Sequence, residues 1–462
     1  MLIKTVNNLY FYNSYDNKVV KIPYEYQHLP SESIKNLLLD KQIIEIDNFL
    51  FDAPSISTAE SPDYVTANLI INVTDVCNLR CSYCAYSGEY PLERVHGKKI
   101  IDQETVQKAL DDYFLKSKDY YKVSIYGGEP SVAREIIQFI FSYSRKKAQG
   151  KRLEFSLNTN AYHLTDALIE SFIQNDVELH VSVDGPKEIH DKYRVNIKGK
   201  GTFDRVIVNL TKIRKLDSEY YSRKVSFIAT LAPPYRIDLL KSLYESSDLF
   251  RRQRWFVNYV NPLNTNFFND IPFSLDDSLR QHNKDISKLA DEYIESLVRG
   301  NIYHFGHWFF GDLIKKVHHR EMNPSRTVWI NGSCTPGMDK LFVDTNGNYY
   351  PCERSGDFMY MGDVTIGVQQ GYVYDVINRY RENCESGYCS TCVNARFCDT
   401  CYLAARSANG LDFSQKYNYC HKKIDKLKSA LYIYCSVMEQ NSKALDFFDE
   451  DALKRKNGAP QR

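Results

Sequence analysis

The sequence predicts an α/β fold, a partial (β/α)6 TIM-like barrel with a small α+β module before it and a cysteine-rich domain after it. Between residues 67 and 265, short runs of β-forming residues alternate with helical segments, as in a parallel sheet with crossover helices. The twelve cysteines form two groups, three at 77–84 and nine between Cys334 and Cys435. This distribution indicates two separate metal-binding regions.

The sequence of residues 1–66 predicts a small α+β module at the start of the chain. Apolar residues alternate over 9–22 around an Asn/Asp-rich turn, which predicts a hairpin. A serine cap followed by helical spacing predicts a helix over 31–43, and the Ser- and Pro-containing stretch 55–62 is expected to be a linker.

Residues 67–265 predict the barrel, with catalytic residues expected at the carboxyl ends of its strands. Each expected strand is a short apolar run of the kind found in buried parallel sheets. The expected strands are 67–74, 121–128, 152–160, 177–185, 225–232 and 255–260. The expected helices between them include 102–117, 131–149, 166–175 and 202–215.

The rest of the chain predicts three further regions. Residues 266–330 are a helical linker, with helical spacing over 276–322. Residues 331–440 carry nine cysteines and little apolar periodicity, so metal clusters are expected to hold this domain together. Residues 441–462 are the tail, which is expected to be disordered from Lys454 onward.

The bulk composition excludes some classes of protein. The chain has 462 residues and a formal net charge of +1, which argues against a general nucleic-acid binder. It contains neither an apolar run long enough to span a membrane nor a signal-peptide pattern, so we expect a cytoplasmic protein without a membrane partner. In that reducing compartment, cysteines are metal ligands or reactive thiols more often than disulfides.

Cys77, Cys81 and Cys84 form a CxxxCxxC triplet on one expected loop. Thiolates are the usual ligands of iron–sulfur clusters, which normally take four. Three neighbouring cysteines would therefore hold a [4Fe–4S] cluster and leave one iron open. The alternatives are a zinc site or a cluster completed by a distant residue.

At these residues the sequence resembles the radical S-adenosylmethionine (SAM) superfamily, whose triplet has an aromatic residue where Tyr83 stands. The resemblance implies that the open iron binds SAM. One electron then cleaves SAM, and the resulting 5′-deoxyadenosyl radical takes a hydrogen from the substrate. In such enzymes the cofactor supplies the chemistry and the protein orients it.

The resemblance extends to the expected SAM contacts. The segment from Gly127 to Pro130 matches the family's GGEP motif, and glycine permits close backbone approach. Asn158 matches a position near the ribose, and an arginine fork suits a carboxylate. Residues 184–186 are expected to form a structural turn with a possible ribose contact. The implied SAM-binding residues are Tyr83, Gly127, Gly128, Glu129, Pro130, Asn158, Ser182 and Arg194.

The second cysteine region resembles the SPASM domain, whose members hold two auxiliary iron–sulfur clusters. By this resemblance the first cluster would be bound by Cys334, Cys352 and Cys401, with Cys384 as a candidate fourth ligand, and the second by Cys389, Cys392, Cys398 and Cys420. The spacing before Cys401 is two residues, whereas the family pattern has three. Cys435 is interpreted as a buried thiol, and the alternative for the region is a zinc ribbon.

Together these features predict a radical SAM/SPASM peptide maturase. The resemblance implies a cross-link (thioether, carbon–carbon or ether) in a ribosomally made precursor peptide, whose leader the opening module binds as an added strand. A reductant protein such as flavodoxin or ferredoxin is the second expected partner. The alternatives are an anaerobic sulfatase-maturating enzyme that forms formylglycine and a non-catalytic, zinc-dependent peptide-binding protein.

Overall fold

A computed structural model describes residues 1–52, 65–116, 118–262, 264–269, 271–329, 334–408 and 410–449. The chain divides into two compact units. The sheet unit comprises Ser57–Asp285 and Cys334–Val373, and the terminal unit comprises Met1–Ile56, Ile286–Ser333 and Tyr374–Arg462. The expected linker at 55–62 and residues 450–462 of the expected tail lie outside the described residues.

The sheet unit is built on an eight-stranded sheet with the order β10-β9-β8-β7-β6-β5-β12-β13. The six strands from β5 to β10 are parallel, and each lies within or beside one of the six strands expected from the sequence. The parallel-dominated α/β architecture is therefore confirmed. These strands are β5 (Asn68–Asn72), β6 (Tyr120–Tyr126), β7 (Arg152–Thr159), β8 (Glu178–Ser182), β9 (Val225–Leu231) and β10 (Arg254–Tyr259).

The two faces of the parallel sheet differ in polarity. Leu69, Val123 and Phe155 stand side by side in register and are fully or nearly fully buried. The next row points to the other face and includes the polar residues Ser124 and Ser156, whose hydroxyls lie 2.7 Å apart. Alternate residues of a strand point to opposite faces, so the apolar row packs under helices and the polar row faces inward.

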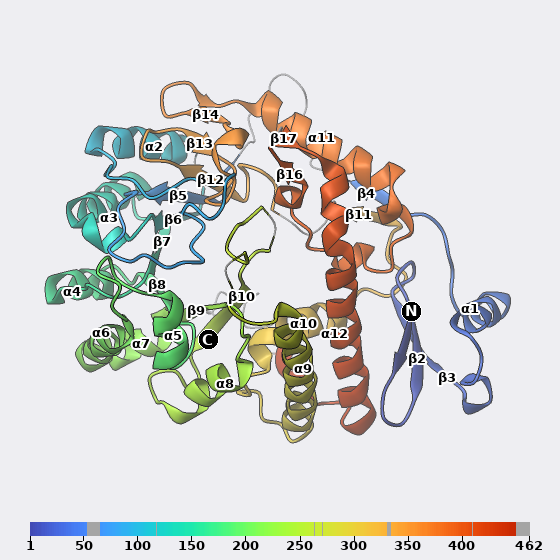
Figure 1. Ribbon diagram of the computed structural model, residues 1–462. Helices are drawn as coiled ribbons and strands as arrows, with labels where there is room; N and C mark the ends of the chain where they lie inside the picture. The colour runs from blue at the N-terminus through green and yellow to red at the C-terminus, as the bar shows by residue number, and fades with distance from the viewer. Residues whose placement is uncertain are drawn as a thin grey trace. The chain divides into compact units, whose positions relative to one another are not determined.

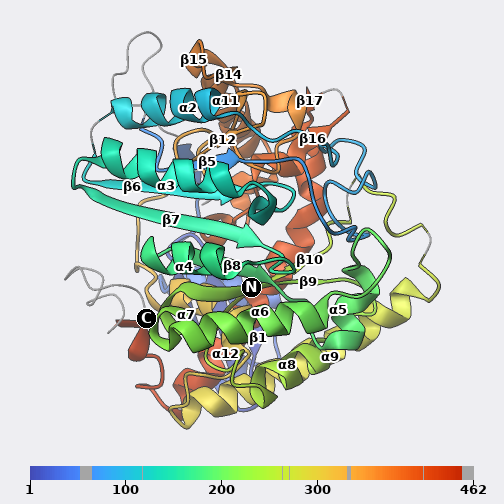
Figure 2. The ribbon, with the colours of Figure 1, turned by 90° about the vertical axis from the view of Figure 1, so that its left-hand side faces the viewer.

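Helices cover the apolar face. They are α2 (Gln103–Leu115), α3 (Arg134–Ala148), α4 (Asp166–Gln174), α5 (Lys187–Tyr193), α6 (Phe203–Leu216), α7 (Ser218–Lys224) and α8 (Ile237–Ser246). Figures 1 and 2 show α2, α3, α4 and α6 in succession along one side of the strands. Phe141 of α3 meets Phe155 of β7 with ring centroids 4.8 Å apart.

Two further strands extend the sheet beyond the expected six. β12 (Lys340–Val343) runs parallel to β5, and β13 (Tyr349–Tyr350) pairs antiparallel with β12. Both come from the region expected to be one cysteine-rich domain at 331–440. Residues 334–373 cluster instead with the sheet unit, together with β14 (Gly362–Asp363) and β15 (Gly367–Val368).

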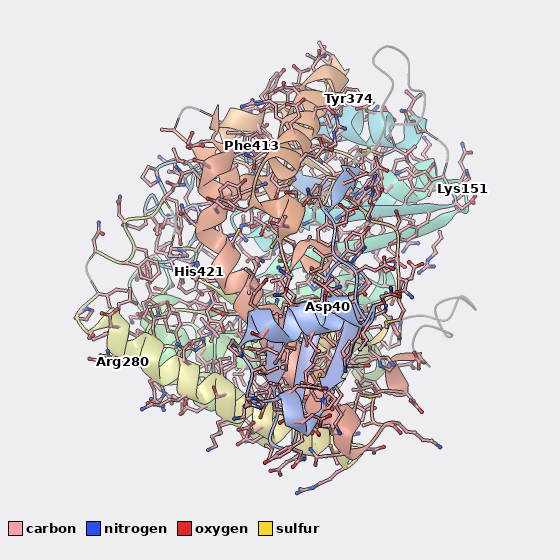
Figure 3. The ribbon with its side chains drawn as sticks, turned by 90° about the vertical axis from the view of Figure 1, so that its right-hand side faces the viewer. Asp40, Lys151, Arg280, Tyr374, Phe413 and His421 are labelled. Carbon is pink, nitrogen blue, oxygen red and sulfur yellow. The ribbon has the colours of Figure 1, made fainter. Side chains whose placement is uncertain are left out.

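The terminal unit begins with a three-stranded antiparallel sheet of β1 (Leu2–Lys4), β2 (Leu9–Asn13) and β3 (Lys18–Ile22). β2 and β3 form the expected hairpin. Helix α1 (Ser31–Asp40) packs Ile34 and Leu38 onto Leu9, Phe11 and Ile22. Figure 3 shows α1, with Asp40 at its end, lying against this sheet.

Four α-helices lie in the rest of the described chain. They are α9 (Leu275–Val298), α10 (Asp312–His318), α11 (Gln370–Ser386) and α12 (Cys420–Gln440), of which α9 and α11 each begin in the sheet unit. Short strands are β4 (Leu50–Asp52), which pairs in parallel with β11 (Thr327–Trp329), and the pair β16 (Arg406–Ser407) and β17 (Gly410–Leu411). Among the described helices, none has the length and apolar character needed to cross a membrane.

Candidate active site

The cysteine triplet lies on the loop after β5, in the sheet unit. The backbone N–H of Arg80 donates to Val195 O at 2.7 Å, and that of Ser82 donates to Tyr193 O at 3.2 Å. The loop is thus fixed against the segment that follows α5. Each of the three thiols is half-buried.

Burial makes the three thiols hard to ionise. It raises the pKa of Cys77 and of Cys81 to about 12, and it raises that of Cys84 as well. For Cys77 the nearby Glu129, Cys81 and Cys84 raise the pKa further. Three thiolates gathered in one partly buried place need a compensating cation, and this need fits a metal-binding site.

Gly127 and Gly128 follow β6 and touch the cysteine loop backbone to backbone. The Gly128 N–H donates to Thr74 O at 2.7 Å, and the Glu129 N–H donates to Val76 O at 2.9 Å. A Cβ on Gly128 would lie 2.4 Å from Val76 O, which no side chain can do without moving the loop. A protonated amino group donates hydrogen bonds, so one bound here would be held by backbone carbonyl oxygens and not by these N–H groups.

Glu129 is 1% exposed and joins three segments. Its carboxylate accepts hydrogen bonds from Ser131 N at 3.1 Å, from the Thr159 hydroxyl at 2.7 Å and from Asn160 N at 2.7 Å. Burial raises the pKa of Glu129, and these hydrogen bonds offset part of the rise. Pro130 begins the short 3₁₀ helix Pro130–Val132. The segment from Gly127 to Pro130 therefore fixes the cysteine loop against the end of β7.

Arg194, Asp184 and Tyr83 form a buried group beside the triplet. Arg194 Nε donates to Asp184 Oδ2 at 2.9 Å, and the Tyr83 hydroxyl donates to the same oxygen. Thr230 N donates to Asp184 Oδ1 at 2.9 Å. Arg194 also approaches Cys81 Sγ at 3.9 Å. Burial lowers the pKa of Arg194, but Asp184 and Tyr83 outweigh it and leave the pKa well above its usual value.

Asn158 and Ser182 lie at the carboxyl ends of neighbouring strands, as expected, and both are half-buried. Asn158 pairs in register with His180, and Ser182 pairs with Ile228. Their predicted SAM contacts stay predictions. Asn160, two residues after Asn158, has a clearer link to the triplet, because its Nδ2 lies 2.8 Å from Asn78 Oδ1 and 3.9 Å from Cys77 Sγ.

A carboxylate and two tyrosines gather next to Cys84. The Tyr86 hydroxyl donates to Glu353 O at 3.1 Å, and the rings of Tyr86 and Tyr126 are 6.5 Å apart. Burial raises the pKa of Tyr126, and the charges of Glu353 and Cys84 raise it further. Glu353 Oε1 lies 3.8 Å from Lys340 Nζ, and the other oxygen, Oε2, is buried and has no hydrogen-bond partner in the described part of the chain. Such a carboxylate is a candidate proton acceptor.

In the terminal unit the structure brings together the four cysteines expected for the second auxiliary cluster. Cys392 interacts with Cys398 and Cys420, and Cys389 interacts with Cys392 and Cys384. Cys384 is therefore a neighbour of this set. Cys435, in the interior of α12, is 1% exposed, as expected for a structural thiol.

The three cysteines expected for the first auxiliary cluster are divided between the units. Cys334 and Cys352 belong to the sheet unit, whereas Cys401 belongs to the terminal unit. Cys352 is buried and Cys334 is half-buried. Their shared role stays a prediction.

Sequence reasoning missed two site residues, Asn160 and Glu353, and for Asp184 it predicts a structural turn with a possible ribose contact, not the partner of Arg194. The available signal for that partnership is an acidic side chain ten positions before Arg194. Asn160 directly follows β7, at the carboxyl end of the strand, where polar residues of parallel strands face the site. Glu353 directly follows Cys352, a position that carries no pattern of its own.

Comparison with known families matches residues 71–236 to the radical SAM superfamily. The matched segment runs from β5 to the residue before α8 and contains the triplet, the Gly127–Pro130 segment and Arg194.

Curated relatives share a long stretch of the chain. The cysteine-type anaerobic sulfatase-maturating enzyme of Clostridium novyi (strain NT) is 23% identical over 304 residues, which is 65% of this chain and 75% of that enzyme. The serine-type anaerobic sulfatase-maturating enzyme of Bacteroides thetaiotaomicron is 30% identical over 152 residues, covering 32% of this chain and 37% of that enzyme.

Solved structures share the fold. The chain matches hexahistidine-tagged anSMEcpe with bound AdoMet at a TM-score of 0.63 and 18% identity, covering 86% of this chain and 100% of that one. It matches native anSMEcpe with bound AdoMet and Kp18Cys peptide at a TM-score of 0.61 and 19% identity, covering 80% and 98%.

Proposed function

This chain is a radical SAM enzyme, and from that premise we propose that it modifies a peptide by taking a hydrogen atom from one of its side chains. The proposal rests above all on the packing of the triplet loop against Gly128 and Glu129, with Arg194 beside Cys81.

The donor set fits a [4Fe–4S] cluster with one open iron. Three thiols come from one short loop and are half-buried, and sulfur is the ligand such clusters require. When bound, the cluster and SAM supply an electron and a 5′-deoxyadenosyl radical for hydrogen abstraction. Gly127 and Gly128 pack backbone to backbone against the loop, and their carbonyl oxygens are acceptors suited to the amino group of a bound SAM.

Asp184 holds Arg194 and Tyr83 in place on the other side of the triplet. A fixed guanidinium is suited to bind the SAM carboxylate, and the ion pair removes the entropy cost of ordering it. In this arrangement Arg194 shares its charge between Asp184 and the ligand. Asp184 is thus a positioning residue for SAM.

A substrate radical must lose an electron and a proton, or couple, to become a stable product. Glu353, with an unpartnered buried oxygen near Cys84 and Tyr126, is placed to accept the proton. The cysteines of the terminal unit fit a further iron–sulfur cluster that accepts the electron, and Cys334, Cys352 and Cys401 remain the candidates for another.

The product we propose is a cross-link in a ribosomally made precursor peptide. The opening sheet β1–β3 with α1 supports this, since an exposed sheet edge can bind an extended leader as an added strand. The solved relative anSMEcpe with a bound peptide has the same fold, which supports a peptide substrate. A small reductant protein and a cytoplasmic location remain part of this proposal.

Formylglycine formation in a sulfatase is the second candidate. It is favoured by the similarity to sulfatase-maturating enzymes over 65% of the chain. The third alternative, a non-catalytic zinc protein, is set aside because the chain is a radical SAM enzyme.

Anaerobic incubation of the reconstituted enzyme with SAM and two substrates separates the candidates. One substrate is any small precursor peptide found encoded beside the gene, and the other is a CxPxR-type sulfatase peptide. Mass spectrometry is expected to show loss of two hydrogens from the precursor. Formylglycine in the sulfatase peptide, with an unmodified precursor, would contradict cross-linking and establish the second candidate.

A further inference from the structure

Lys416 is a lysine buried inside the terminal unit. It lies in the 3₁₀ helix η9 (Phe413–Tyr419) just before α12, and it is 2% exposed. Lysine is almost never fully buried unless its charge is paired, because an isolated ammonium in the interior is costly. The partner of Lys416 therefore indicates what this part of the molecule contains.

The partner is sulfur. Lys416 Nζ lies 3.1 Å from Cys384 Sγ, and Cys384 is completely buried. The ammonium also lies 4.5 Å from the centroid of the Tyr380 ring. Cys384 in turn hydrogen-bonds to Cys389, and the Cys420 thiol approaches Lys416 O at 4.0 Å. Lys416 thus contacts the cysteine group from two sides.

The position of Lys416 is fixed by its neighbour. The Tyr417 hydroxyl hydrogen-bonds to Asn383 Oδ1 at 3.3 Å. A Cβ on Gly387 would lie 2.2 Å from this hydroxyl oxygen, so η9 is packed closely against the turn that leads from α11 to Cys389. These contacts of Tyr417 fix η9 against the turn and so keep the neighbouring Lys416 ammonium at the cysteines.

We propose that Lys416, whose ammonium donates a hydrogen bond to Cys384 Sγ next to the expected ligand Cys389, places a buried positive charge beside the auxiliary cluster of the terminal unit and raises that cluster's reduction potential. The inference rests on the proposed function, which places a cluster on Cys389, Cys392, Cys398 and Cys420. Reduction adds one negative charge, and a buried cation beside the thiolates stabilises the more negative state. A raised potential favours acceptance of an electron from the substrate radical.

The test is an anaerobic redox titration followed by electron paramagnetic resonance. The full-length chain carries Cys77→Ala, Cys81→Ala and Cys84→Ala, so the remaining signals come from auxiliary clusters. Into it we introduce Lys416→Met, Lys416→Arg or the control Lys288→Met, whose exposed side chain pairs with Glu292 within α9 of the same unit. One auxiliary signal is expected to move to lower potential with Lys416→Met and to stay unchanged with the other two.

An unchanged potential in Lys416→Met that retains its iron would overturn the role of Lys416 and leave the proposed function intact. Iron of about four atoms per chain in the enzyme with its triplet intact would overturn both, since no auxiliary cluster would then exist. If Lys416→Met does not fold, Lys416→Gln replaces it. Its neutral amide is expected to give a lower potential than Lys416→Arg, and equal potentials would refute the proposal.

Discussion

At the scale of single residues, Asp184 organises one side of the site, although no motif singled it out as a binding residue. Its two oxygens receive Arg194, Tyr83 and Thr230 N. The sequence shows an acidic residue in a Gly- and Pro-containing turn, which is an ordinary turn pattern. Its role depends on the hydrogen bonds of the folded chain, and these cannot be read from spacing alone.

Replacing Asp184 by Asn should destabilise the sheet unit and weaken SAM cleavage. The substitution leaves the Arg194 charge buried without its counter-ion, and breaking one side of a buried pair costs about 3–5 kcal/mol. Thermal unfolding and 5′-deoxyadenosine formation measure the two effects. The control is Asp166→Asn, which breaks the exposed pair with Lys212 and should cost less than about 1 kcal/mol. Equal losses in the two variants would contradict the role of Asp184.

Gly128→Ala should prevent correct packing of the cysteine loop, because its Cβ would lie 2.4 Å from Val76 O. We expect a protein that loses the iron of the triplet and no longer cleaves SAM. Iron analysis in a variant background without the terminal-unit cysteines measures this directly. Gly371→Ala, with no atom within 4 Å of the new Cβ, is the matched control and should behave as the parent. Normal SAM cleavage by Gly128→Ala would refute the close-packing argument.

At the scale of elements, strand positions were predictable and the edge of the sheet was not. β5 to β10 are short runs rich in apolar and β-forming residues, separated by helical periodicity, so each is visible in the sequence. β12 has four residues and β13 has two, which is too short for a periodic signal. These strands form because β5 offers an open edge, a fact that belongs to the assembled sheet.

Helix α12 contains two cysteines in different surroundings, and replacing each in turn distinguishes a cluster ligand from a thiol that only packs in the core. Cys420 is its first residue and lies with Cys392 and Cys398, whereas Cys435 lies buried in its interior. Cys420→Ala should lose about four iron atoms per chain, and Cys435→Ala should lose none. Iron analysis after anaerobic reconstitution makes the comparison. Retained iron in Cys420→Ala would exclude it as a ligand.

At the scale of the whole molecule, the units do not follow chain order. The opening module shares a core with the end of the chain, since Ile3 and Tyr12 pack against Val317, Leu427 and Leu431. The sequence predicts each of these segments separately, but it contains no signal that pairs residues more than four hundred positions apart. The predicted domains are consecutive ranges of the chain, so they do not describe how distant segments combine into one unit.

Because of this shared core, the opening module stabilises the fold of the terminal unit, whether or not it also binds a leader peptide. Ile3→Ala should destabilise the protein by about 2–5 kcal/mol, because it leaves a cavity against α12. Val6→Ala, at a side chain that is 88% exposed, should change stability little. Thermal unfolding of both variants tests the point. A neutral effect of Ile3→Ala would indicate a detachable module.

The central claim is that the triplet holds the cluster that cleaves SAM. The direct measurement is 5′-deoxyadenosine formed by the reduced, anaerobic enzyme and by the variant with Cys77, Cys81 and Cys84 all replaced by Ala. We expect product from the parent enzyme and none from the variant, which should still keep the iron of its terminal-unit cysteines. Continued 5′-deoxyadenosine formation by the variant would contradict the account.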